Sequence, residues 1–184
     1  MRFLKYNKRR ILIVFIILIV SILVFFFLPQ HKSNTQIGTI ISPTQTPYTT
    51  AKVINVIDGD TIKIDTGQKV RYIGINTPEI TYPEKPNDCY ALEAKEKNKE
   101  LVEGKTVKLK KDISETDKYG RLLRYIFIEN SSSTSEAIFI NKILITEGYA
   151  RIMSIPPDLK YYPLFKEEQV KAKENKKGLW NQCL

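Results

Sequence analysis

The sequence predicts a mainly β domain with α: a small barrel of five short strands with about three helices packed outside, preceded by one transmembrane helix. Three observations lead to this prediction. A long apolar run near the N-terminus is followed by a polar linker. Short alternating apolar and polar segments then recur between turn residues, which is typical of β-strands. Longer charged segments with spaced apolar residues, ended by glycine, are typical of helices.

The apolar run at residues 11–28 contains no charged side chain, and as a helix rising about 1.5 Å per residue it is long enough to cross a bilayer. The preceding residues 1–10 carry five basic and no acidic side chains, which places them on the cytoplasmic side. We therefore expect a single-pass cell-membrane protein whose remaining residues are extracellular. A cleaved signal peptide, which would make the protein secreted, is the alternative. The length of the run and the lack of small residues after it favour the anchor.

Residues 29–50 are rich in Ser, Thr, Gln and Pro and are expected to form a flexible linker, which leaves residues 51–184 for the folded domain. The chain has a net charge of +9, but six of its 29 basic residues and none of its 20 acidic residues precede residue 50. The domain itself therefore has a net charge of only +3. Its charge alone says little about its partner.

The domain begins with three predicted strands. Residues 51–57 and 61–65 flank a turn with the sequence Asp58-Gly59-Asp60, which is a strong hairpin signal. After a second turn at residues 66–68, residues 69–75 are expected to form the third strand. The prolines that follow, up to residue 88, indicate a loop.

A helix is predicted over residues 89–103, because apolar residues are spaced through a charged segment that ends at Gly104. Residues 105–110 and 121–129 are expected to form the fourth and fifth strands. Further on, a short helix within residues 137–147 and a final helix over residues 158–177 are predicted. Five short strands that close on themselves with helices outside indicate an OB-type barrel.

The types of residue that are missing exclude several chemistries. The single histidine, His31, lies in the linker, so the domain has no Ser-His-Asp triad, no Cys-His pair and no histidine-based zinc site. Cys89 and Cys183 either form a disulfide, as an oxidising compartment would allow, or remain unpaired thiols. Carboxylates, arginines, lysines and a hard metal ion remain, and this set suits phosphodiester hydrolysis.

Four short segments carry candidate site residues. The Asp58-Gly59-Asp60 turn offers oxygen ligands to a cation, although an ordinary hairpin is the alternative. Arg71 lies in the same row of its strand as apolar residues and therefore needs either a partner or a function. The segments Asn76-Thr77-Pro78-Glu79 and Asp117-Lys118-Tyr119-Gly120-Arg121 present polar groups on turns, where a solvated surface loop is the alternative reading.

Together these segments resemble the staphylococcal nuclease (thermonuclease) family, in order and in spacing, over nearly the whole domain. The resemblance rests on VIDGDTIKI at 56–64, RYIGINTPE at 71–79, the EA within CYALEAKE at 89–96, DKYGRLLRYIF at 117–127, EGYARI at 147–152 and AKENKKGLW at 172–180. It implies an OB-fold nuclease that cleaves DNA and RNA with Ca²⁺, is endonucleolytic, leaves 3′-phosphate ends and has a monomeric catalytic domain.

The resemblance also implies roles for individual residues. Glu79 would activate the attacking water as a general base, and Arg71 and Arg121 would stabilise the charge that develops on the phosphate. Lys118 and Tyr119 would lie near the phosphate and the sugar of the substrate.

The metal would be bound by the Asp60 side chain, the Thr77 carbonyl and Asn76. Family members often have aspartate at the position of Asn76, so we expect weaker metal binding here.

Two further expectations follow from the resemblance. Relatives carry paired cysteines at similar places, which favours a Cys89–Cys183 disulfide. Relatives can also carry tyrosines that pack against the substrate base where this chain has Met153-Ser154-Ile155-Pro156. Base stacking is therefore expected to be weaker, or to be supplied by Tyr161 and Tyr162.

Three functions remain in competition at this point. The first is an active, metal-dependent nuclease tethered outside the membrane. The second is a catalytically inactive OB-fold module that binds nucleic acid or protein at the membrane surface, and the third is a structural domain with no ligand. The joint presence of Asp60, Arg71, Glu79 and Arg121 favours the nuclease, because a site that has lost its function usually loses some of these residues.

Overall fold

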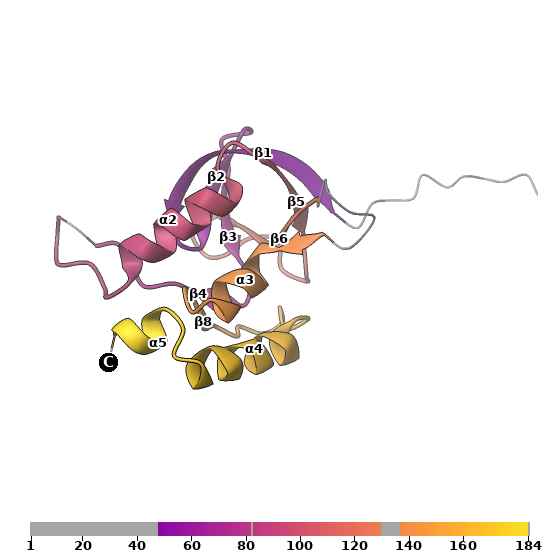
Figure 1. Ribbon diagram of the computed structural model, residues 1–184. Coiled ribbons are helices and arrows are strands. Elements are labelled where there is room, and N and C mark those ends of the chain that lie inside the picture. The colour runs from indigo at the N-terminus through magenta and orange to yellow at the C-terminus, as the bar shows by residue number, and fades with distance from the viewer. Residues whose placement is uncertain (1–47, 82, 130–136, 184) are drawn as a thin grey trace, which may run out of the picture. The chain divides into compact units, whose positions relative to one another are not determined.

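The computed structural model describes residues 48–81, 83–129 and 137–183, and in them the strands curve into a barrel with helices on its outside (Figure 1). The predicted anchor at 11–28 and most of the predicted linker lie outside these residues. Within the described part of the chain, no helix is both long and apolar enough to cross a membrane.

The barrel consists of β1 (Thr49–Asp58), β2 (Thr61–Ile64), β3 (Lys69–Tyr72), β5 (Thr106–Lys110) and β6 (Leu122–Ile128). β1 pairs antiparallel with β2 and β5, while β2 pairs with β3 and β5 with β6, again antiparallel. A parallel pairing of β3 with β6 closes the cylinder. The predicted five-stranded barrel is thus confirmed, and its topology fits an OB-fold.

The predicted strand over residues 69–75 is wrong in one respect, because the chain turns after β3. Gly74 has a φ of +81°, a backbone conformation that residues with a side chain rarely adopt. A Cβ built on Gly74 would also lie only 2.7 Å from the ring of Phe165, so there is no space for a side chain. The next two residues form the short strand β4 (Ile75–Asn76), which pairs with β8 (Arg151–Ile152). This separate two-stranded ladder was not predicted.

Three longer helices pack outside the barrel, as predicted: α2 (Ala91–Val102), α3 (Ile140–Thr146) and α4 (Tyr162–Glu174). α2 packs on β1, and α3 packs on both β6 and α4. The predicted final helix over 158–177 is too long at both ends. It starts only at Tyr162, where Pro163 occupies the first turn, a position that tolerates proline because no backbone N–H is needed there.

Two small elements escaped prediction: the strand β7 (Ile138–Phe139), which pairs with β6, and the helix α5 (Leu179–Gln182). The core lies inside the barrel and under α3 and α4. Its largest fully buried side chains are Tyr72, Tyr125, Phe165, Ile62, Ile75, Ile126, Ile140, Leu144, Ile145 and Leu179.

A disulfide joins Cys89, just before α2, to Cys183, just after α5, which confirms the expected pairing. The two cysteines are 94 residues apart in the sequence. The bond therefore ties the C-terminal end of the domain to the loop that leads into α2.

Candidate active site

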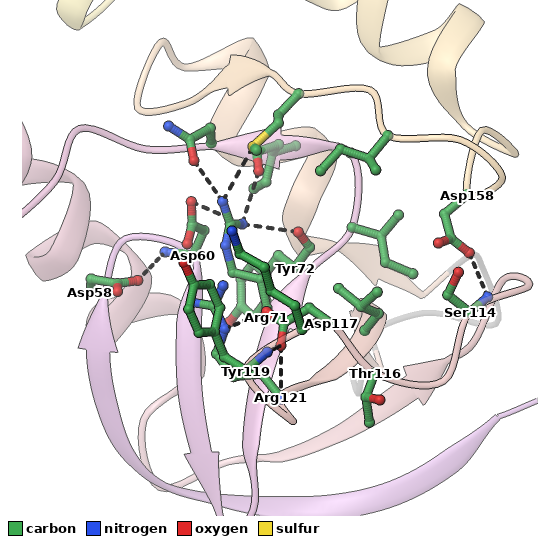
Figure 2. Close-up of a pocket in the computed structure, with 18 of the residues that line it drawn as sticks. Asp58, Asp60, Arg71, Tyr72, Ser114, Thr116, Asp117, Tyr119, Arg121 and Asp158 are labelled. Carbon is green, nitrogen blue, oxygen red and sulfur yellow. Dashed lines mark hydrogen bonds and ion pairs between the residues drawn. The ribbon is translucent and has the colours of Figure 1, made fainter.

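A cleft of about 570 Å³ opens at one end of the barrel and collects almost every residue that the sequence singled out. Figure 2 shows its labelled side chains, with Asp60 beside Arg71, Arg121 beside Asp117, and Asp158 at the far end. Seven of the eight predicted catalytic, metal and substrate residues line it: Asp60, Arg71, Asn76, Glu79, Lys118, Tyr119 and Arg121. The eighth, Thr77, is buried and bonds directly to Asp60.

Asp60 is a buried carboxylate at the end of the β1–β2 turn. Its Oδ2 accepts a hydrogen bond from the backbone N–H of Thr77 at 2.7 Å and forms an ion pair with Nη1 of Arg71 at 3.0 Å. Burial raises the pKa of the Asp60 carboxyl to about 7, although the charge of Arg71 opposes this rise. A cation bound at Asp60 would favour the ionised carboxylate further.

The turn that carries Asp60 is formed as the local sequence predicts. Asp58 pairs with Thr61 across the hairpin, and its Oδ1 accepts the backbone N–H of Asp60 at 3.0 Å. A Cβ on Gly59 would lie 2.6 Å from the side chain of Thr77. Gly59 thus lets the turn approach the segment after β4, which brings Asp60 and Thr77 together.

Arg71 is buried, with 8% of its surface exposed, and almost all its contacts are with oxygen atoms. Nη1 donates to the carbonyls of Tyr72 at 3.0 Å and Ile75 at 2.9 Å, in addition to the ion pair with Asp60. Nη2 donates to Oδ1 of Asn76 at 2.6 Å. These contacts, drawn as dashed lines in Figure 2, fix the guanidinium at the base of the cleft.

The three predicted metal ligands are brought together. Thr77 bonds to Asp60 through its backbone, and Nδ2 of Asn76 donates to the Thr77 carbonyl at 3.2 Å. One carboxylate and two carbonyl oxygens form an all-oxygen set, which suits a hard cation such as Ca²⁺. Asp60 is the one charged ligand in this set. Among the described residues, no group of three or more Asp, Glu, His or Cys side chains is arranged to hold a metal.

Glu79 lies on the loop after β4, and its exposed side chain lines the cleft. Its backbone is fixed from both sides, because its N–H donates to Oδ2 of Asp88 at 3.0 Å and its carbonyl accepts the N–H of Asp88 at 3.0 Å. Asp88 directly precedes Cys89. The disulfide therefore anchors the segment that holds the Glu79 loop.

Arg121 follows the turn between β5 and β6, and Asp117 holds it there. Oδ1 of Asp117 accepts the backbone N–H of Arg121 at 3.0 Å, and Oδ2 accepts its Nε at 2.7 Å. The terminal nitrogens of the guanidinium are free of any ion pair within the part of the chain that is described. Tyr119, which is 71% exposed, places its ring beside both Lys118 and Arg121.

Neither Tyr161 nor Tyr162, which were expected to stack on a substrate base if stacking is not simply weaker, lines this cleft. The Tyr161 ring packs edge-on against Tyr125 at a centroid distance of 4.6 Å and belongs to an aromatic cluster beneath α4. Met153, Ile155 and Pro156 line the cleft, with Met153 beside Arg71.

Sequence reasoning missed two buried asparagines that support the site. Asn98 on α2 accepts the hydroxyl of Tyr72 at 2.9 Å and donates to the carbonyl of Asp58 at 3.0 Å, so it joins the helix to β3 and to the hairpin. Asn141 on α3 donates to the carbonyl of Ile73 at 2.9 Å. The signal for Asn98 was its position in line with Ala91, Ala94 and Val102 on the buried face of α2.

The far wall of the cleft was also missed. Asp158 accepts the backbone N–H groups of Ile113 and Ser114 at 2.9 and 2.8 Å, and so joins the loop before α4 to the loop after β5. Nothing in the sequence pairs these segments, which lie more than forty positions apart.

The arrangement as a whole has a clear chemical character. Arg71 of β3 and Arg121, just before β6, both line one cleft, together with an exposed carboxylate and an all-oxygen cation set. Guanidinium groups suit the binding of phosphate oxygens, and a carboxylate suits the removal of a proton from water.

Comparison with known proteins agrees with this character. Residues 69–182 match the family described as staphylococcal nuclease homologue. The chain is 35% identical over 159 residues to endonuclease YncB of Bacillus subtilis (strain 168), covering 82% of this chain and 71% of that protein. It is 36% identical over 135 residues to a thermonuclease of Staphylococcus hyicus, covering 72% and 76%. A thermonuclease of Staphylococcus intermedius is 35% identical over 131 residues, with coverage of 70% and 74%.

Proposed function

The chain belongs to the family of staphylococcal nuclease homologues, and from this premise we propose that it is a metal-dependent nuclease that hydrolyses phosphodiester bonds of DNA and RNA. The action proposed is endonucleolytic, by a monomeric catalytic domain, with 3′-phosphate ends as products. The observation that best supports a nuclease is that one cleft is lined by all four of Asp60, Arg71, Glu79 and Arg121.

Arg71 and Arg121 are proposed to bind the scissile phosphate from two sides. Arg71 is rigid, because Asp60 and Asn76 hold both terminal nitrogens. Within the described residues, the Arg121 guanidinium forms its ion pair through Nε, which leaves its terminal nitrogens available to a ligand. Donors that are already oriented stabilise the charge that develops on phosphorus without reorganising during the reaction.

Glu79 is proposed to accept the proton of the attacking water. Its side chain is exposed to the cleft while its backbone is fixed by Asp88, so the carboxylate is both reachable and positioned. Lys118 and Tyr119, on the turn before Arg121, are proposed to contact the phosphate and the sugar of the bound strand.

Ca²⁺ is the proposed metal, bound by Asp60, the Thr77 carbonyl and Asn76. When bound, it would act as a Lewis acid at a phosphoryl oxygen and orient the substrate. Because Asn76 contributes no charge, the proposed site needs a higher Ca²⁺ concentration than a site with two carboxylates.

The test uses the purified full-length protein with single-stranded DNA and with RNA, in Ca²⁺, in Mg²⁺ and in chelator. Glu79→Gln keeps the shape of the side chain but removes the base, and is compared with Glu84→Gln, an exposed glutamate on the same loop that does not line the cleft. We expect Ca²⁺-dependent cleavage that is lost in Glu79→Gln and kept in Glu84→Gln.

The same experiment addresses the competing function of an inactive binding module. One feature favours it: Oδ1 of Asn76 already accepts a short hydrogen bond from Arg71, which competes with a cation for that oxygen. Binding of nucleic acid without cleavage in every ion would support that module and overturn the nuclease.

We further propose that residues 11–28 anchor the protein in the cell membrane, with the nuclease domain outside. The Cys89–Cys183 disulfide supports an oxidising location. Fractionation of cells, followed by protease treatment of intact cells, tests this proposal. A membrane-bound protein that is digested from outside supports it, and a protein that stays intact until the cells are lysed overturns it.

A further inference from the structure

Met153 contacts Arg71, and no sequence motif predicted this contact. Sδ of Met153 lies 3.8 Å from Nη2 of Arg71. Every other acceptor on the two terminal nitrogens within the described residues is an oxygen atom. A thioether is a weak acceptor, so the N–H that faces Met153 is the one held least firmly.

The fold places Met153 at this point. It directly follows β8, whose Ile152 pairs with Ile75 of β4, and its own N–H donates to the carbonyl of Gly74 at 3.0 Å. The side chain thus reaches the guanidinium from across the ladder. It lines the cleft and keeps 40% of its surface exposed.

Met153 is also the one methionine of the folded domain. The chain has two methionines, and the other is Met1. Its two cysteines form the disulfide, so there is no free thiol. An exposed thioether is therefore the side chain in the domain that peroxide oxidises most readily.

We propose that Met153 is a modification site: its oxidation to the sulfoxide by hydrogen peroxide or another peroxide inactivates the site through Arg71. An S–O bond forms as the peroxide O–O bond breaks. The sulfur loses two electrons, and the remaining peroxide oxygen takes up a proton and leaves as water from hydrogen peroxide, or as the alcohol from an organic hydroperoxide.

The sulfoxide oxygen is a strong, polar acceptor where the thioether was a weak one. From a sulfur 3.8 Å away, an added oxygen can come within hydrogen-bond distance of Nη2. The N–H then has an internal partner that a phosphate must displace. The unoxidised thioether, a weak acceptor, yields this N–H to the phosphate.

The test rests on the proposed nuclease activity and compares three full-length proteins: the unsubstituted protein, Met153→Leu, which cannot be oxidised at this position, and Met153→Gln, whose amide oxygen imitates the sulfoxide. Each is assayed before and after peroxide treatment stopped with catalase, relative to its own untreated sample. Peptide mass spectrometry follows the addition of oxygen to Met153 and to Met1.

We expect treatment to lower kcat/KM of the unsubstituted protein about tenfold or more, the size of effect typical of a hydrogen bond to a charged group. Met153→Leu keeps its own starting rate after treatment. Met153→Gln is slow before treatment and is not slowed further. Methionine sulfoxide reductase restores the treated unsubstituted protein, and its melting temperature stays constant, which general damage to the fold would not allow.

The outcomes separate this inference from the function on which it rests. An untreated protein without nuclease activity overturns the proposed function. An active protein that keeps its rate although Met153 carries the oxygen overturns the inference, as does a Met153 that stays unmodified while Met1 is oxidised. Equal loss of rate in Met153→Leu also overturns it, because the damage then lies elsewhere.

Discussion

Glu79 and Asp88 are joined by two hydrogen bonds, each 3.0 Å long: the Glu79 N–H donates to the Asp88 carboxylate, and the Asp88 N–H donates to the Glu79 carbonyl. The proposed base therefore sits on a loop fixed at its backbone, although its side chain is exposed. Several consequences of this and the neighbouring contacts can be measured.

Asp88→Ala removes the carboxylate that holds the Glu79 N–H. We expect kcat to fall about three- to tenfold with little change in KM, because a loosened base is misplaced for part of the time. Asp65→Ala, at an exposed position in the β2–β3 turn, is the control and should be neutral. An unchanged rate in Asp88→Ala would show that Glu79 needs no support from Asp88.

Arg71→Lys should lower kcat about a hundredfold or more. One ammonium group cannot hold Asp60 and Asn76 and also offer a planar pair of donors to phosphate. Arg124→Lys is the matched control, since Arg124 is equally buried and pairs with Glu115 outside the cleft. It should reduce stability while the folded protein keeps its rate, and similar kinetic losses in both variants would contradict the role given to Arg71.

Asn76→Asp adds a second carboxylate to the proposed Ca²⁺ site. The Ca²⁺ concentration for half-maximal activity should fall about tenfold, because a charged oxygen binds a hard cation more strongly than an amide. Calorimetric titration with Ca²⁺ provides a readout that does not depend on activity. Asn55→Asp, on the exposed side of β1, controls for the added charge. Unchanged affinity in Asn76→Asp would mean that Asn76 is not a ligand.

Replacing both cysteines by serine should lower the free energy of unfolding by about 2–4 kcal/mol, because the disulfide closes a long loop that is otherwise free in the unfolded chain. Urea unfolding measures this loss. Activity should fall as well, at temperatures where the protein remains folded, since the segment holding the Glu79 loop is released. If stability falls but the cleavage rate of the folded variant does not change, the disulfide has a structural role only.

Asn98→Ala should destabilise the fold by about 2–3 kcal/mol, because it leaves the Tyr72 hydroxyl and the Asp58 carbonyl without a partner. Burial raises the pKa of Tyr72 well above its ordinary range, so the hydroxyl remains a donor that needs an acceptor. Asn98→Asp restores the acceptor and should recover part of the loss. Thermal melting compares the two variants. Equal melting temperatures would mean that the hydrogen bond from the Tyr72 hydroxyl does not contribute to stability.

Local sequence predicted those parts of the fold that depend on neighbouring residues. The Asp58-Gly59 step specified the hairpin that carries Asp60, and the alternation around it gave the strands. Gly104, with a φ of +73°, ends α2 as expected. The charged Arg71 in an apolar row required either a partner or a function, and the structure gives it Asp60 as a partner. The family resemblance supplied the roles, which the cleft then brought together.

Predictions failed where the decisive contact lies far along the chain. The strand over 69–75 breaks at Gly74, where the ring of Phe165, some ninety positions away, leaves no space for a side chain. The sequence also did not show that Tyr161 packs into an aromatic cluster with Tyr125 and Phe165.

The sequence by itself determined the hairpin, the barrel strands, the main helices and the set of residues that could act on a phosphodiester, because turns, periodicity and residue chemistry are local properties. Only the tertiary structure decided how firmly each group is held. The fixing of Glu79 by Asp88, of Tyr72 by Asn98 and of Arg71 beside Met153 depends on which distant segments pack together, and packing is settled by the whole core at once.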